Sequence, residues 1–288
     1  MGGQVGPSFS LPLAIYCYCG KGFKMLKKLN LSWIIVLAGV LVTGGCGGGE
    51  PEISQEVPKG NTPVAMTKID PTTSATLKGK VLFDGDLPRP RRLAMDAEPA
   101  CAALHTEPVY SEVVVANDNN TLRHVFVYVK EGLEGKVFET PKEPAIIDQK
   151  GCIYKPHILG VQTNQPIKIL NSDSTTHNIH PLPKNNREWN ESMAPGVPPK
   201  NKKFPREEVM IPVKCNVHPW MKNYIGVLKH PFFAVTDEEG SFEIKGLPPG
   251  EYTFEAWHEY LKEGVTSHKV ILATSETKSV EFTLKQAS

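Results

Sequence analysis

The segment Cys215-Asn-Val-His218-Pro-Trp-Met221 places three potential metal ligands within seven residues. A thiolate, an imidazole and a thioether form the soft donor set that suits copper. Pro219 disfavours a helix here and fixes a tight loop, which can turn three side chains toward one point. A strand could not do so, because side chains at odd spacings point to opposite faces. The spacing therefore predicts a copper-binding loop.

A second segment carries a related pattern. Residues 158–170 have the pattern of a β-hairpin and are followed by Asn171-Ser-Asp-Ser-Thr-Thr-His177-Asn-Ile-His180. Further along the chain, Glu208 to Lys214 is predicted to be a strand that leads into the Cys215–Met221 loop. The pair N-S-D…H-N-I-H and C-N-V-H-P-W-M resembles the cupredoxin family, and within it amicyanin-type proteins with a short C-x-x-H-x-x-M loop. The resemblance implies a Greek-key β-sandwich with one type 1 (blue) copper ion at one end.

The same resemblance assigns roles to individual residues. It implies that the copper ligands are His177, Cys215, His218 and Met221. Asn178, Asn216 and Pro219 are expected to brace the ligand loop without touching the metal. Two imidazoles and a thiolate form a trigonal plane with a distant Met sulfur, and a rigid site of this kind reorganises little on electron transfer. The alternatives are zinc, which seldom recruits Met, and no metal at all.

The resemblance also implies a docking surface for a redox partner. Pro219 and Trp220 are expected to flank the exposed edge of His218 and to form an apolar rim, as small transient redox interfaces require. The basic segment from Pro183 to Arg206 is predicted to be an irregular loop. It is read as a solvated loop, with a docking collar for an acidic partner as the alternative. His157, His180 and His258 are predicted not to be ligands.

The rest of the chain is predicted to be mostly β, and the fold class all-β. The 25 Pro and 24 Gly punctuate short apolar runs, few of which have a helical period. Residues 111–116 and 122–130 are predicted to be strands. The run TDEEGSFEIKGLPPGEYTFEAWHE, from Thr236 to Glu259, resembles the carboxypeptidase regulatory-like domain, a transthyretin-like β-sandwich.

That second sandwich is expected to be split. The two strands that precede the motif in the family match Gly79-Lys-Val81 and Val125 to Val129, which lie before the metal motifs. We therefore predict one sandwich from residues 76–137 and 231–286, with the cupredoxin-like domain of residues 138–230 inserted in it. Insertions at exposed turns are tolerated when the termini of the inserted domain lie close together.

The N-terminal region has the features of a targeting signal. Residues 25–45 resemble a bacterial lipoprotein signal. They begin with the basic Met25-Leu-Lys-Lys, continue with an apolar run too short to span a membrane, and end before Cys46 in Thr43-Gly-Gly-Cys46. Thr43 stands where that motif usually has Leu. An ordinary signal peptide cleaved nearby is the alternative. Residues 1–24 are expected to be a gene-model artefact, with an unusually long leader as the alternative. Residues 46–75 are predicted to be a disordered tether. The expected location is the periplasm, with lipidated Cys46 anchored to the outer membrane or cell surface.

Cysteine usage predicts one disulfide. With Cys46 assigned to lipid and Cys215 to metal, the mature chain keeps Cys101 and Cys152 in a compartment that permits oxidation. We expect these two to be bridged; the alternative is two buried free thiols.

Charge and histidine content limit the possible functions. Lys+Arg number 32 and Asp+Glu 31, which argues against nucleic-acid binding by bulk charge. None of the nine His lies in the H-x-H pairs that are typical of multicopper oxidases, so an enzyme is not expected. The leading hypothesis is a tethered one-electron carrier between partners such as c-type cytochromes or a dehydrogenase. The alternative is a structural, storage or carbohydrate-adhesion lipoprotein.

Overall fold

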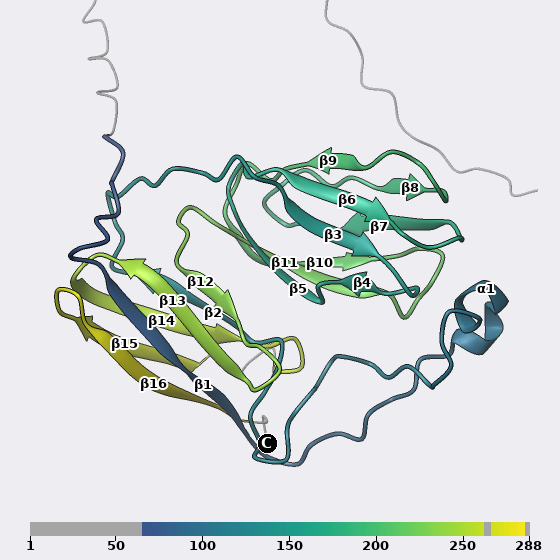
Figure 1. Cartoon of the computed structure of the whole chain (residues 1–288), viewed down its shortest axis with the longest axis horizontal. Coiled ribbons are helices and arrows are strands. Elements are labelled where there is room, and N and C mark those ends of the chain that lie inside the picture. Colours follow the sequence, from purple (N-terminus) through teal and green to yellow (C-terminus); the bar gives the residue numbers. More distant parts are fainter. Residues whose placement is uncertain (1–64, 262–265, 286–288) are drawn as a thin grey trace, which may run out of the picture. The chain divides into compact units, whose positions relative to one another are not determined.

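The computed structural model describes residues 65–261 and 266–285, and the regular secondary structure of these residues is almost entirely β-strand (Figure 1). The all-β prediction is therefore confirmed. The predicted signal peptide of residues 25–45, the segment 1–24, Cys46 and the tether up to residue 64 lie outside the described residues. Within the described ranges, no helix has the length and apolar character needed to cross a bilayer.

The first sandwich consists of two sheets that enclose one core. Its three-stranded sheet has the order β13 (Ser241–Leu247), β1 (Ala75–Asp84), β16 (Thr277–Lys285). Its four-stranded sheet has the order β12 (Phe233–Val235), β2 (Phe126–Glu131), β14 (Gly250–Trp257), β15 (Thr266–Leu272). Alternate residues of both sheets are buried together, among them Leu77, Val127, Phe254 and Phe282. The strands thus follow the apolar alternation of the sequence.

The second sandwich is built from residues between β2 and β12. One sheet has the order β5 (Ile158–Gln162), β11 (Lys222–Leu228), β10 (Glu208–Lys214), β7 (His177–Pro181), β8 (Glu191–Met193). The other has the order β4 (Tyr154–Lys155), β3 (Ala145–Gln149), β6 (Ile167–Asn171), β9 (Lys200–Lys202). Their facing residues form one core, which includes Ile147, Ile169, Ile211 and Ile225. The predicted boundaries after residues 137 and 230 fall in segments without strands.

Aromatic side chains of the first sandwich pack on glycines of the second. Phe126 of β2 is buried with Ile158 of β5 and Leu228 of β11. Gly160 of β5 pairs with Gly226 of β11, and a Cβ atom on Gly226 would lie 2.6 Å from the Phe126 ring. Because carbon atoms do not approach so closely, this contact needs glycine. Both faces of β2 are consequently buried, one in each sandwich.

Two predicted elements differ from the structure. Residues 158–170 do not form a hairpin, because β5 pairs with β11 while β6 pairs with β3 in the opposite sheet. The four residues between them can span roughly 13 Å, enough to cross the roughly 10 Å between packed sheets. Residues 111–116 were predicted to be a strand, but among the described residues they make a single bridge, from Ala116 to Leu122.

The basic segment of residues 183–206 is more ordered than the predicted irregular loop. It contains β8, which pairs with β7, and β9, which pairs with β6, so it crosses from one sheet to the other. The Glu191 carboxylate forms ion pairs with Lys200, at 2.5 Å, and with Lys202. The single carboxylate thus offsets one of these two positive charges and ties the two lysines to β8.

Glu208, the first residue of β10, holds the start of this segment. Its buried carboxylate accepts hydrogen bonds from the backbone N–H groups of Lys184, Asn185 and Asn186, the last two at 3.0 and 3.2 Å. Burial alone would raise the pKa of Glu208, but these hydrogen bonds lower it overall. The ionised form is therefore the one that stabilises the fold.

Replacing Glu208 by Gln should lower the free energy of unfolding by about 2–3 kcal/mol at about pH 7, because the three backbone N–H groups and the Asn186 Nδ2 lose a charged acceptor. The pKa of Glu208 is lower in the folded protein than in the unfolded chain, where it is about 4.3. The wild type is therefore more stable than the variant by the full amount above the unfolded pKa, and this difference disappears as the pH falls through the folded pKa. Urea unfolding at about pH 7 and about pH 3 measures both. Glu207→Gln, which affects a half-exposed pair with Lys229, is the control and should change stability by less than about 1 kcal/mol. An equal loss at both pH values would refute the electrostatic account.

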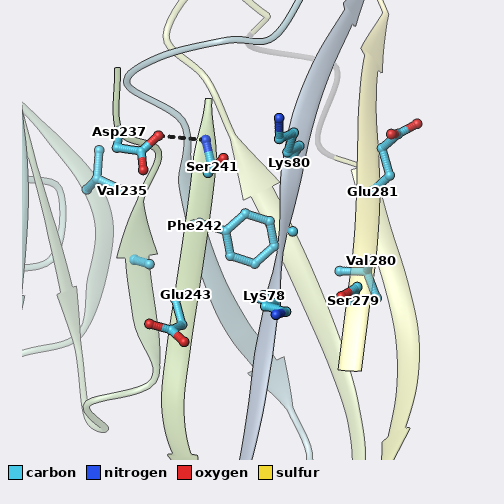
Figure 2. A pocket seen from close by; sticks show the side chains of 12 residues that line it. Lys78, Lys80, Val235, Asp237, Ser241, Phe242, Glu243, Ser279, Val280 and Glu281 are labelled. Atoms are coloured by element: carbon cyan, nitrogen blue, oxygen red, sulfur yellow. Dashed lines mark hydrogen bonds between the residues drawn. The ribbon is translucent and has the colours of Figure 1, made fainter. Parts of the chain in front are cut away.

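A hollow of about 710 Å³ is lined by residues of β1, β12, β13 and β16. Figure 2 shows the ring of Phe242 beside β1, with Lys78, Lys80, Glu243 and Glu281 around it. Phe242 is 5% exposed, so the residues that line the hollow offer no open aromatic platform.

Candidate metal centre

Neighbouring strands bring the two metal motifs together. β7 begins at His177, and its partner β10 ends one residue before Cys215. The two strands are antiparallel, so the start of β7 and the end of β10 lie at the same end of the sheet. The ligand loop then closes on itself, because Cys215 N–H donates to the Met221 carbonyl at 3.2 Å and Met221 N–H donates to the His218 carbonyl at 3.0 Å.

The predicted ligands converge on a buried point. The Nδ1 atoms of His177 and His218 lie 2.9 Å apart, and the Cys215 Sγ lies 3.8 Å from the His218 Nδ1. The donor atoms of these three residues all lie within 4.8 Å of one another. Met221 is 1% exposed and packs in the same core cluster as Cys215. The fold thus brings two imidazoles and a thiol together out of contact with water, and it buries the Met221 side chain in the core cluster that contains Cys215.

Asp173 orients His177, a role that the sequence motif did not reveal. Its Oδ2 accepts a hydrogen bond from the His177 Nε2 at 2.8 Å and a second from Cys152 N–H at 2.8 Å. Its Oδ1 accepts from Gly151 N–H at 2.7 Å. With the proton held on Nε2, the Nδ1 lone pair of His177 faces His218 and is available to a metal. The i,i+4 spacing of Asp173 and His177 was the available signal.

The thiol of Cys215 lies in an environment that favours its metal-binding form. Burial alone would raise the pKa of Cys215, but His177 and the backbone N–H groups of Asn178 and His218 lower it overall. Burial alone would lower the pKa of His177, whereas Cys215 and Asp173 raise it overall. The pair therefore stabilises a thiolate, which is the form that binds metals.

Asn178 links the two motifs as expected for a bracing residue. Its side-chain Oδ1 accepts a hydrogen bond from Asn216 N–H at 2.6 Å and one from the Cys215 thiol at 3.3 Å. Its Nδ2 donates to the Asn190 Oδ1 at 2.6 Å. Its carbonyl accepts from the Tyr154 hydroxyl at 2.6 Å, a contact that sequence reasoning missed.

The prediction that one edge of His218 is exposed is wrong, because this residue is only 2% exposed. Residues 91–110, here called the cap segment, contain α1 (Pro99–Ala102) within the long connection from β1 to β2 (Figure 1). A disulfide joins Cys101 of the cap segment to Cys152, and the Cys101 Sγ lies 3.6 Å from the His218 Nε2. Residues 91–110 show no apolar periodicity, so their packing against His218 was not predicted.

Trp220 and Pro219 also differ from the predicted rim. The indole of Trp220 is half-buried against the disulfide cluster, and its Nε1–H donates to the Cys152 carbonyl at 3.0 Å. Pro219 is exposed, and together with Val217 it lines a groove of about 500 Å³ against cap residues that include Arg91 and Arg92. Trp220 is therefore a packing residue between the ligand loop and the cap segment.

The remaining histidines lie outside the ligand set. His180 contacts Asn216 and Glu188 at 3.2 and 2.6 Å. His157 lies between Glu259 and Glu112, with its Nδ1 3.8 Å from the Glu112 carboxylate. His258 has a buried Nε2 without a hydrogen-bond partner in the part of the chain that the structure describes. Burial lowers the pKa of His258 to about 4.

Comparisons with known proteins give partial structural likenesses. No protein-family model matches the chain, and no curated protein matches it significantly. A copper-containing nitrite reductase from Thermus scotoductus is 17% identical over 35% of this chain and 25% of its own, with a TM-score of 0.29. A purple cupredoxin from Nitrosopumilus maritimus is 22% identical over 29% of this chain and 98% of its own, with a TM-score of 0.25. An oxidised amicyanin mutant is 17% identical over 31% of this chain and 86% of its own, with a TM-score of 0.27. The chain thus spans a quarter of the nitrite reductase, and its function has to be argued from the donor atoms themselves.

Proposed function

We propose that this protein binds one type 1 copper ion through His177, Cys215, His218 and Met221 and carries single electrons between redox partners. The observation that supports this most directly is the buried convergence of two Nδ1 atoms and one Sγ, with a Met sulfur in the same cluster. A thiolate, two imidazoles and a thioether form the donor set of electron-transfer copper sites.

The distances fit one ion. A nitrogen ligand lies about 2.0 Å from a bound metal and a sulfur ligand about 2.3 Å from it. When the nitrogen–metal–sulfur angle is about 110–120°, the two donor atoms lie about 3.5–3.7 Å apart. The Cys215 Sγ and His218 Nδ1 are 3.8 Å apart. Two nitrogens at about 2.0 Å from one ion lie about 3.3 Å apart, so the 2.9 Å between His177 and His218 needs an adjustment of a few tenths of an ångström.

The protein's part in electron transfer is to hold these groups still. Copper supplies a one-electron couple, Cu(II)/Cu(I), when it is bound. Asp173 fixes the ring of His177, Asn178 fixes the start of the ligand loop, and the cap segment excludes water from His218. Ligands that are held by such hydrogen bonds move little between oxidation states, which keeps the reorganisation small.

The partner and location belong to the same proposal. A c-type cytochrome or a dehydrogenase of the periplasm is the proposed partner class, and a lipid on Cys46 is the proposed anchor. Because His218 is covered, the exposed Val217 and Pro219 offer the shortest approach to the ligand loop.

Purified protein should become intensely coloured on addition of Cu(II), because thiolate-to-copper charge transfer absorbs visible light. Cys215→Ala should abolish the colour, while Met221→Leu should keep it and change the reduction potential. Voltammetry should give a reversible one-electron wave. A coloured site without that wave would instead indicate storage or structure, and nitrite turnover or oxygen uptake would indicate an enzyme.

A further inference from the structure

The Cys101–Cys152 disulfide lies directly against the candidate ligands. Its Cys101 Sγ is 3.6 Å from the His218 Nε2, on the opposite side of the imidazole from Nδ1. The turn that carries Cys152 is held by Asp173, whose carboxylate also binds His177. Both cysteines are 0% exposed. The disulfide is therefore coupled to both imidazoles of the centre.

The atoms around this disulfide form a second soft donor set. The donor atoms of Cys101, Cys152 and His218 all lie within 4.8 Å of one another. The 3.6 Å between the Cys101 Sγ and the His218 Nε2 matches the roughly 3.5–3.7 Å expected for sulfur and nitrogen ligands of one ion. Met95 is buried in the same cluster as the two cysteines. Thiolate and thioether sulfurs select Cu(I).

We propose that the reduced form of this cysteine pair is a second metal site, in which Cys101, Cys152 and the His218 Nε2 hold Cu(I). The site exists only after reduction, because a disulfide sulfur has no thiolate to offer. A dithiol supplies the two electrons: the Cys101–Cys152 bond breaks, two thiols form, and the dithiol becomes a disulfide. Binding of Cu(I) then releases the two thiol protons to solvent, and the imidazole N–H proton leaves as well when the His218 Nδ1 also holds a metal.

The cap segment can open without unfolding a sandwich. Its apolar contacts form a small separate cluster, in which four residues are buried: Leu93, Met95, Cys101 and Cys152. Its helix α1 has only four residues. Few hydrogen bonds join the cap segment to the second sandwich, among them the one between the His105 Nε2 and the Gly151 carbonyl at 2.8 Å. Elements with so few buried contacts open locally at low cost. This gives a reductant and Cu(I) a route to the cysteines.

The test uses a Cys215→Ser background, which removes the thiolate of the first centre. This variant is reduced anaerobically with a phosphine, freed of phosphine, and titrated with Cu(I) buffered by a colorimetric chelator. We expect the reduced variant to take one more equivalent of Cu(I) from the chelator than the oxidised variant does. Its affinity for this ion should be at least about 100-fold higher than that of the oxidised variant (about 2.7 kcal/mol). X-ray absorption should show at least two sulfur neighbours per copper. In wild-type protein, reduction should raise bound copper from one ion to two.

The matched control adds Cys101→Ser and Cys152→Ser to the same background and should lose the extra equivalent while circular dichroism stays unchanged. Equal copper uptake by the reduced and oxidised forms, or by the control, would overturn the proposal. So would failure of the phosphine to reduce the bond in folded protein. The wild-type colour tests the first centre independently, because it does not depend on these cysteines.

Discussion

Copper is expected to raise the free energy of unfolding of this protein by about 4 kcal/mol when free copper is about 1,000 times its Kd, and Cys215→Ser should remove that gain. A metal that binds the folded state and not the unfolded chain stabilises by mass action. The ligands come from β7 and from the loop between β10 and β11, which meet only in the folded sandwich. Binding energy is therefore folding energy.

Chemical unfolding with and without copper measures this effect. Cys215→Ser is nearly isosteric, so the metal-free variant should unfold within about 1 kcal/mol of the wild type. His180→Ala is the matched control, because His180 lies next to Asn216 at 3.2 Å but outside the donor group, and it should keep the copper-dependent gain. Full copper stabilisation of Cys215→Ser would show that the ion binds elsewhere.

The ligand loop was predictable because its information is local. Cys215, His218 and Met221 lie within one tight turn, and their spacing alone indicates a metal loop. The apolar alternation of β1 and β16 likewise follows from the sequence, because each of these strands faces a single core. Such features depend on neighbouring residues and on a period of two.

Long-range packing was not predictable in the same way. The crossing of residues 163–166 between two sheets leaves the same alternating pattern as a hairpin, so periodicity could not distinguish them. The covering of His218 depends on a four-residue helix and on a disulfide that spans 51 residues. The helix leaves no periodic signal, and the disulfide, although it was predicted and is confirmed, does not reveal that it packs against His218. The mistake over the exposed edge of His218 has the same origin, because a ligand's exposure depends on chain that is remote in sequence.

Asp173→Ala is expected to have the largest effect of any single substitution outside the ligand set. It removes the acceptor of two backbone N–H groups, at Gly151 and Cys152, and of the His177 Nε2–H. Leaving buried donors unpaired costs about 1–3 kcal/mol each, so we expect a loss of about 3–5 kcal/mol in stability. Copper affinity should fall about 10–100-fold, because the ring of His177 is no longer held.

The comparison of Asp173→Ala with two other variants separates the roles of this carboxylate. Asp173→Asn keeps one acceptor oxygen and should lose less stability. Asp148→Ala removes a half-buried carboxylate that accepts from the Ser172 hydroxyl at 2.7 Å, and it should leave copper affinity unchanged. If Asp173→Ala lost stability but kept both copper affinity and the reduction potential, the carboxylate would only brace the Cys152 turn. A loss of both stability and copper affinity would instead mean that the Asp173 carboxylate positions the Cys152 turn and the His177 imidazole together. A change in either of these two elements would then alter copper binding.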